Sequence, residues 1–308
     1  MSASSNTGAA VAESLLRRGT PIRVTGRDAA RLSRFQAAGA QVAPVAAGDA
    51  AGLAAALDGA TAAFVMLAPG LLPESEDFAA YQREVIAAVE KALQATRSVR
   101  TVVGLSGWAA NFPGARGPVW GLRRFEQALG RVAESGVAVT SLRPGWFMEN
   151  ALPMITELTA TGVTRGVIPP DRPLPMVATS DIGEVAADIL TGAREPVDTL
   201  ELQGPADLTL AEATAVIARR AGIAEARYER IDAAQLRAGL LAAGFTAHMA
   251  EGVTDMSMDV AEGRIRMLRP RGPQTATPTT FEEFVAARPD PGAPDGTRRP
   301  TSDGGARR

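Results

Sequence analysis

Up to residue 145, segments with apolar residues at helical spacing alternate with short apolar runs typical of strands. This pattern predicts helices separated by short strands. Helical spacing of apolar residues marks the segments 8–18, 29–38, 52–57, 74–96 and 119–135. Runs of β-branched or continuously apolar residues predict strands at 22–25, 41–45, 62–67, 101–105 and 137–142. Strands joined by helices form right-handed crossovers, so the pattern predicts a doubly wound parallel sheet of the α/β class.

After residue 150 the predicted helices and strands alternate less regularly. Helices are expected at 151–160, 180–192, 209–221 and 232–243, with short strands near 175–179 and 198–202. We therefore divide the chain into a sheet domain at 1–150, a smaller cap region at 151–285 that is interleaved with the sheet, and a tail. The tail, 286–308, is poor in apolar residues and is predicted to be disordered.

Composition and charge narrow the classes of function. The 308-residue chain is 46% hydrophobic, has a formal net charge of −2 and contains no cysteine. This charge gives no general attraction to nucleic acid or to an anionic membrane, and thiolate chemistry is excluded. No apolar stretch approaches the roughly 20 residues that span a bilayer, and no signal peptide is recognisable, so we expect a cytoplasmic protein. A single lysine among many arginines, with abundant alanine and glycine, indicates a bacterial source.

Several short motifs occur in a fixed order along the chain. The most specific is LRPGWFMEN at 142–150, and the others lie at 6–11, 24–28, 47–49, 179–186, 202–205 and 278–285. Together they resemble the NmrA-like family of atypical short-chain dehydrogenases, over roughly residues 6–286. The resemblance implies a Rossmann-like fold in which 1–150 is a dinucleotide-binding-type domain.

The start of the chain departs from that pattern. A dinucleotide-binding turn needs an apolar first strand followed by several glycines, so that backbone N–H groups can approach a pyrophosphate. Residues 1–4 are too short and polar for this strand, Ser2 and Ser5 stand at expected glycine positions, and only Gly8 remains. The first strand is therefore expected to be missing, because the true start lies upstream or because cofactor binding has been lost.

The usual catalytic pair of short-chain dehydrogenases, a tyrosine four residues before a lysine, is also missing. Tyr81, Tyr228 and Lys91 do not have this spacing, and Trp120 and Arg124 stand at the equivalent helix. Neither an indole nor a guanidinium serves as an acid near neutral pH. The resemblance therefore implies a reductase that works without the pair.

The resemblance places cofactor contacts at the carboxyl ends of the strands. Arg27 suits a 2′-phosphate and hence NADP(H), or it is a solvated residue that opens a helix. Thr7 and Gly8 offer N–H groups to an anion, or form a capping turn from Asn6 or Thr7. Asp49 meets adenine or caps the next helix. The remaining expected cofactor contacts are Asn6, Ala68, Pro69, Ser106, Gly107, Pro144 and Gly145.

Three residues are candidates for catalysis. Ser106 is expected beside the nicotinamide, or as a loop hydroxyl bonded to backbone, and Asn150 can hold a carbonyl. His248, the single histidine, either contacts substrate from the cap or is structural, and a lone histidine gives no reason to expect a metal. The candidate substrate cleft, or otherwise core, consists of Trp108, Asn111, Phe112, Trp120, Trp146 and Phe147.

These features leave three functions open. The first is an NAD(P)H-dependent reductase of a quinone, enone or ketone, for example in secondary metabolism, with a small apolar or aromatic substrate. The second is a non-catalytic NmrA-like regulator that senses a dinucleotide or binds a partner. The third is a cofactor-independent cyclase or isomerase on the same fold. NADP(H) is the expected cofactor. If the missing glycines of the N-terminal turn mean that cofactor binding has been lost, no cofactor is expected.

Overall fold

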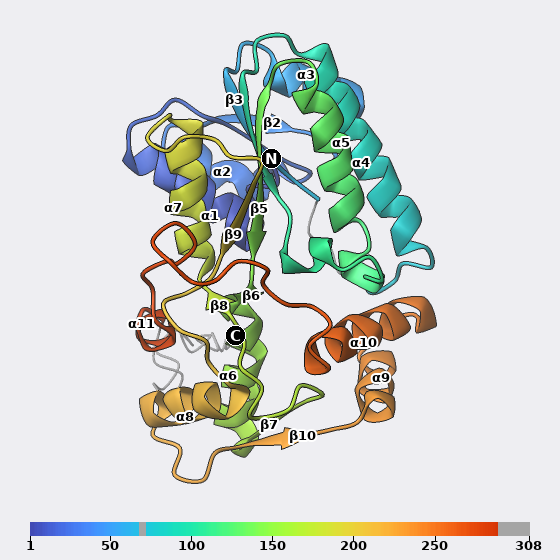
Figure 1. The fold of residues 1–308 in the computed structure, drawn as a ribbon, viewed down its shortest axis with the longest axis vertical. Helices are drawn as coiled ribbons and strands as arrows, with labels where there is room; N and C mark the ends of the chain where they lie inside the picture. Colours follow the sequence, from blue (N-terminus) through green and yellow to red (C-terminus); the bar gives the residue numbers. More distant parts are fainter. Residues whose placement is uncertain (68–71, 289–308) are drawn as a thin grey trace, which may run out of the picture.

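A parallel sheet covered by helices on both faces forms one half of the molecule, the sheet half (Figure 1). The structure is a computed structural model that describes residues 1–67 and 72–288. Four parallel strands lie in the order β3-β4-β5-β9, namely β3 (Ala62–Met66), β4 (Thr101–Leu105), β5 (Ala138–Pro144) and β9 (Thr199–Leu202). A separate parallel pair consists of β1 (Arg23–Gly26) and β2 (Gln41–Pro44).

Two helical layers bury the sheet. One layer contains α1 (Asn6–Arg17), α2 (Ala29–Ala37) and α7 (Thr179–Leu190), and the other contains α3 (Ala50–Leu57), α4 (Phe78–Ala95) and α5 (Leu122–Ala133). Val102 and Val103 are neighbours in β4, yet both are fully buried, Val102 under the α4 and α5 layer and Val103 under the α1 and α7 layer. Burial on both faces explains why the strands are continuously apolar.

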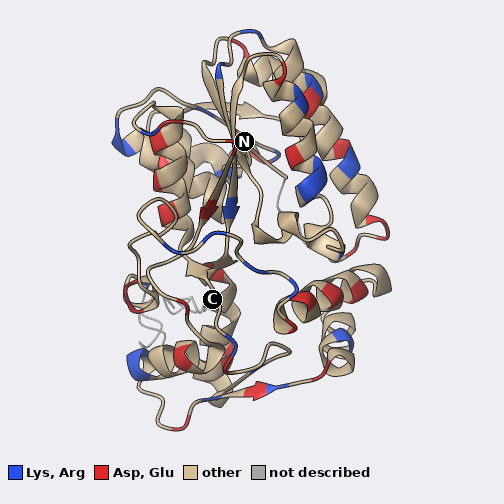
Figure 2. Cartoon of the chain, viewed as in Figure 1, with Lys and Arg blue, Asp and Glu red and all other residues tan. Residues whose placement is uncertain are grey.

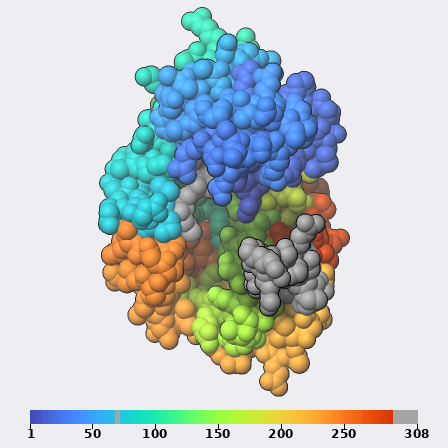
Figure 3. All heavy atoms as spheres, turned by 180° about the vertical axis from the view of Figure 1, so that it is seen from behind, coloured from blue at the N-terminus to red at the C-terminus, as the bar shows by residue number. Residues whose placement is uncertain are grey.

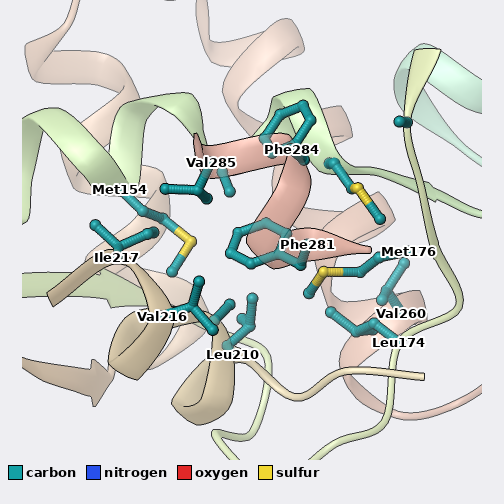
Figure 4. Close-up of a cluster of buried hydrophobic side chains, with 14 of the residues drawn as sticks. Met154, Leu174, Met176, Leu210, Val216, Ile217, Val260, Phe281, Phe284 and Val285 are labelled. Carbon is teal, nitrogen blue, oxygen red and sulfur yellow. The ribbon is translucent and has the colours of Figure 1, made fainter. Parts of the chain in front are cut away.

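The other half, the cap half, has its own apolar core. Its elements are β6 (Trp146–Phe147), α6 (Leu152–Thr161), β7 (Val163–Gly166), β8 (Met176–Val177), α8 (Leu210–Ala221), β10 (Arg227–Arg230), α9 (Ala233–Ala242), α10 (Ala247–Ala261) and α11 (Phe281–Ala286). Phe281 of α11 lies at the centre of this core, among Met154, Met176 and Leu210 (Figure 4). Short 3-10 turns lie at Trp108–Asn111, Gly117–Val119 and Met148–Ala151.

The elements expected up to residue 145 are present, with ends that differ by a few residues. The strand at 101–105 has the predicted bounds, whereas the helix expected at 74–96 is shorter, Phe78–Ala95. The helices α10 and α11 were not predicted. Of the expected tail, 289–308 lies outside the described residues, and Ala286 is still part of α11.

The sheet has a gap between β1 and β3. Among the described residues no strand lies between β1 and β3. Met1 and Ala3 lie at the end of the gap, where the amino nitrogen of Met1 donates a hydrogen bond to Phe64 O at 2.9 Å and Ala3 N donates to Thr25 O at 3.0 Å. The start of the chain therefore touches both flanking strands.

None of the helices in residues 1–67 and 72–288 has the length and apolar character needed to cross a membrane. In the view of Figure 2, α4 and α5 carry both positive and negative side chains, whereas α7 and α10 carry only negative ones.

Candidate functional site

The carboxyl ends of the parallel strands β1, β4 and β5 carry candidate site residues, and Ala3, just before α1, donates a hydrogen bond to Thr25 O near the end of β1. Arg27 directly follows β1, Ser106 follows β4 and Gly145 follows β5. In open parallel α/β sheets this edge is where ligands bind. The expected contacts Ala68 and Pro69 lie outside the described residues.

The first turn of α1 is built from serines. Ser5 is the N-cap, and its hydroxyl accepts a hydrogen bond from Gly8 N at 3.1 Å, so the expectation of a cap from Asn6 or Thr7 is wrong. Ser2 has φ 55°, the one positive φ of a non-glycine residue within the described ranges. This conformation disfavours residues with a β-carbon, so Ser2 holds backbone strain where a glycine would fit without strain.

Gly8 is required by a close approach in the same turn. A β-carbon on Gly8 would lie 2.2 Å from Ser2 O, so no other residue fits without moving the backbone. The cap uses Gly8 N, and no hydrogen bond within the described part of the chain involves the N–H groups of Asn6 or Thr7. These two groups at a helix N-terminus suit an anion.

A pocket of about 140 Å³ opens beside this turn. Its lining combines Ser2, Ser4 and Ser5 with Arg27 and Arg31 from the segment after β1 and with Tyr81 from α4. Within residues 1–67 and 72–288, neither arginine forms an ion pair. Burial raises the pKa of Tyr81, and the positive charge of Arg27 partly offsets this rise. The pocket therefore presents two unpaired guanidinium groups and several hydroxyls.

The sequence showed Tyr81 only as a tyrosine without the spacing of the catalytic pair, and its position beside Arg27 was not predicted. No signal in the sequence connects the two residues, because their proximity depends on how α4 packs against the sheet. Asp49 accepts a hydrogen bond from Gly52 N at 2.9 Å and caps α3, which is the structural alternative expected for it.

Ser106 carries a buried hydroxyl with no hydrogen-bond partner in the described part of the chain. Ser106 is 5% exposed. Its backbone N–H donates a hydrogen bond to Leu142 O at 2.8 Å, which fixes the position of Ser106 at the end of β4. A buried hydroxyl without a partner is unfavourable by about 1–3 kcal/mol, so its retention is a reason to look for a ligand. Gly107 next to it starts the 3-10 turn at Trp108–Asn111.

The segment after β5 is held tightly on both sides. Gly145 N donates to Leu202 O at 2.9 Å and Trp146 N donates to Pro175 O at 3.0 Å, while Pro144 is the last residue of β5. A β-carbon on Gly145 would lie 2.1 Å from Pro175 O. Backbone hydrogen bonds and close packing therefore account for a glycine at position 145, next to Pro144, without any contact to a cofactor.

The expected aromatic residues do not all face one cleft. Trp108, Phe112 and Trp146 pack on the core of the cap half, and Phe147 packs on the sheet core. The ring of Trp120 lies under the guanidinium group of Arg124, which is 3.9 Å from the ring centroid. The Asn111 amide donates to Arg266 O at 3.0 Å.

The other two candidate catalytic residues are exposed. Asn150 lies in the 3-10 turn after β6, and His248 lies in the first turn of α10. His248 Nε2 accepts a hydrogen bond from Phe78 N at 3.3 Å, at the N-terminus of α4. His248 therefore contacts the start of α4, and no group of three potential metal ligands forms among the described residues.

A second, open groove of about 770 Å³ runs from Asn6 toward the cap half and is lined by Glu149, Leu152, Thr179 and Phe284. Seen from behind, the molecule is hollowed between the blue N-terminal part and the green and orange parts (Figure 3).

The open parallel sheet, with helices on both faces and the N-terminus of α1 beside it, defines an α/β protein of the Rossmann-like class. The chain matches the NmrA-like family over residues 1–285 and belongs to that family. The predicted family and the α/β fold are both confirmed.

Two curated relatives are reductases. A (4-alkanoyl-5-oxo-2,5-dihydrofuran-3-yl)methyl phosphate reductase of Streptomyces griseus is 31% identical over 222 residues, which cover 72% of this chain and 73% of that protein. Quinone oxidoreductase 2 of Escherichia coli is 26% identical over 132 residues, or 43% of this chain and 46% of that protein.

Solved structures support the same fold. The NADPH-dependent quinone oxidoreductase of Escherichia coli in complex with NADPH has a TM-score of 0.68 at 23% identity, covering 92% of this chain and 96% of that one. The triphenylmethane reductase of Citrobacter in complex with NADP(H) has a TM-score of 0.73 at 16% identity, covering 92% and 97%.

Proposed function

We propose that this chain is an NADPH-dependent reductase of a small, flat, apolar carbonyl compound such as a quinone, an enone or a ketone. The reductases among its relatives support this class of reaction, and the two relatives crystallised with NADPH or NADP(H) support the choice of cofactor. The proposal does not require a tyrosine and lysine pair.

The observation that carries the proposal is the pair of arginines in the pocket beside the serine turn. Arg27 and Arg31 line this pocket together with Ser4 and Thr25, and no carboxylate belongs to its lining. An acid at this position would accept from a free ribose 2′-hydroxyl, whereas two guanidinium groups suit a 2′-phosphate. The residues present therefore fit NADPH better than NADH.

The remaining groups fit the other parts of the cofactor. Asn6 and Thr7 would bind the pyrophosphate through their N–H groups, and Gly8 lets the backbone turn closely enough to aim them. When bound, NADPH supplies a hydride to the substrate. The Ser106 hydroxyl would donate a hydrogen bond to the substrate carbonyl oxygen, which would polarise the carbonyl and stabilise the developing negative charge.

Dinucleotide titration followed by tryptophan fluorescence tests the proposal. Trp108 lies two residues after Ser106, and saturable quenching by NADPH with much weaker quenching by NADH is the expected result. Turnover is then followed as NADPH oxidation with a panel of quinones and enones. Binding without oxidation of NADPH by any member of the panel would favour a dinucleotide sensor, and no binding of either dinucleotide would refute the reductase.

One observation favours a second candidate, a cofactor-independent cyclase or isomerase. Ser2 holds a left-handed conformation in the turn where dinucleotide-binding proteins use glycine. If neither dinucleotide binds, the strained conformation of Ser2 in this turn would explain the loss of cofactor binding.

A further inference from the structure

Tyr81 of α4 lines the pocket beside the serine turn from a different element than Arg27 and Arg31. The pocket has a volume of about 140 Å³, well below the roughly 300 Å³ of cavities that enclose a whole drug-sized ligand. It therefore suits a single phosphate group. Such a group has three acceptor oxygens, so two arginines leave room for a further, neutral donor.

The Tyr81 hydroxyl is a donor without a partner. Across residues 1–67 and 72–288 it forms no hydrogen bond, whereas the other tyrosine, Tyr228, donates to Ile168 O at 2.9 Å. Tyr81 is half-buried, and a tyrosine hydroxyl removed from water usually finds a hydrogen-bond partner. A free hydroxyl on a residue that lines a pocket therefore points to a ligand.

Packing holds the ring of Tyr81 in place. Its centroid lies 5.8 Å from that of Phe78, which is one turn earlier in α4. The side chain also packs against the apolar cluster that Phe78 forms with Met249 and Val253 of α10. A ring that is already held loses little freedom when its hydroxyl binds a ligand.

The charges around Tyr81 keep the phenol neutral and mark the direction of its oxygen. Burial raises the pKa of Tyr81, the positive charge of Arg27 partly offsets this rise, and Glu84 of the same helix adds to it. The Glu84 carboxylate lies against Gly48 and does not line the pocket. The phenol oxygen thus lies within the field of Arg27 and carries its proton near neutral pH, as a donor must.

We propose that Tyr81 is a specificity-determining residue whose hydroxyl donates a hydrogen bond to the 2′-phosphate between Arg27 and Arg31. This inference rests on the proposed NADPH-dependent function and adds a neutral donor from α4 to the two cations that follow β1. NADH carries no phosphate at this place, so the contribution of Tyr81 is confined to the phosphorylated dinucleotide.

Titration calorimetry with NADPH and NADH tests the proposal without turnover. Tyr81→Phe removes only the hydroxyl, Tyr81→Leu removes the ring as well, and Tyr228→Phe is the matched control. In Tyr81→Phe the Kd of NADPH should rise about 5- to 10-fold while the Kd of NADH stays unchanged. Tyr228→Phe should change neither, because its hydroxyl is bonded to Ile168.

The phenol itself gives a second measurement. In Tyr228→Phe, Tyr81 is the remaining tyrosine, so its phenolate absorbance can be followed against pH with and without 2′,5′-ADP. A bound phosphate at the hydroxyl should move the midpoint upward by roughly half a pH unit or more, because its negative charge disfavours the phenolate. An unmoved midpoint with 2′,5′-ADP bound would overturn the contact.

Two further results would also overturn the proposal. A loss of NADPH affinity in Tyr81→Leu but not in Tyr81→Phe would assign Tyr81 a role through its ring alone. Equal losses for NADPH and NADH in Tyr81→Phe would exclude a role at the 2′-phosphate. In both cases the unchanged chain still binds NADPH, so the reductase proposal stands, whereas no binding of NADPH by the unchanged chain would refute both proposals.

Discussion

Glu149 accepts hydrogen bonds from both donors of Thr179, from its backbone N–H at 3.2 Å and from its hydroxyl at 2.7 Å. Glu149 lies in the turn after β6, and Thr179 is the first residue of α7, so the carboxylate ties the start of the cap half to a helix of the sheet half. Its negative charge also complements the dipole at the N-terminus of α7.

Replacing Glu149 should therefore destabilise the protein. In Glu149→Ala the two buried donors of Thr179 lose their partner, and we expect the free energy of unfolding to fall by about 2 kcal/mol in urea denaturation. Glu149→Gln keeps an acceptor and should lose roughly half as much. The control is Glu225→Ala at an exposed position, and a loss there as large as in Glu149→Ala would contradict the contact.

Gly145 should not tolerate a side chain. A β-carbon at this position would lie 2.1 Å from Pro175 O, and the backbone on either side is hydrogen-bonded to Leu202 and Pro175. Gly145→Ala should lower the free energy of unfolding by about 2–3 kcal/mol, because the strands must move apart. Gly130→Ala in α5, where nothing lies within 4 Å, should instead stabilise by up to about 1 kcal/mol. Equal stability of the two variants would refute the close approach.

The sheet could be predicted because its signal is local. Val102 and Val103 are both apolar, and a strand buried on two faces is the arrangement that satisfies both. The carboxyl edge could also be predicted, since β4 is followed by Ser106 and β5 by Gly145.

The parts that were missed depend on contacts far apart in the sequence. The helix α11 has a clear start signal, the capping box formed by Thr280 and Glu283, but six residues are too few for a periodic pattern. The approach of Tyr81 to Arg27 and the left-handed Ser2 arise from the way α4 and the serine turn pack, which no short window of sequence records.

Arg27 should discriminate between the two dinucleotides. If its guanidinium binds the 2′-phosphate, Arg27→Ala should weaken NADPH binding about tenfold or more and leave NADH binding unchanged. Both are measured by tryptophan quenching. Arg34→Ala is the matched control, because Arg34 pairs with Glu13 at 3.3 Å and stacks on Phe35. An equal loss of affinity for both dinucleotides in Arg27→Ala would remove its assigned role.

Tyr228 should make stability fall at high pH. Its hydroxyl donates to Ile168 O at 2.9 Å, and burial raises its pKa from 10.0 to about 12. The folded chain thus keeps a proton that the unfolded chain releases, so this contribution is present below about pH 10 and is lost between about pH 10 and 12. Tyr228→Phe should flatten the decline of stability over this range. In Tyr81→Phe, where Tyr228 is the remaining tyrosine, the phenolate absorbance should rise near pH 12, and a midpoint near 10 would contradict its burial.

Ser106 should matter for turnover and not for folding. Its hydroxyl is buried without a partner among the described residues, so Ser106→Ala removes an unfavourable group and should leave the free energy of unfolding unchanged or slightly higher. If the hydroxyl polarises the substrate carbonyl, kcat for quinone or enone reduction should fall roughly 10- to 100-fold while the Kd for NADPH stays the same.

Ser98→Ala provides the comparison for Ser106, because Ser98 also has a buried hydroxyl without a partner in the described ranges. It precedes β4, at the amino end of the strand, whereas Ser106 follows the carboxyl end. The Ser98 variant should therefore keep full activity with a similar change in stability. Full activity in both variants would show that the Ser106 hydroxyl takes no part in the reaction, and the polarising group would then have to come from the cofactor or from a backbone N–H at the same edge.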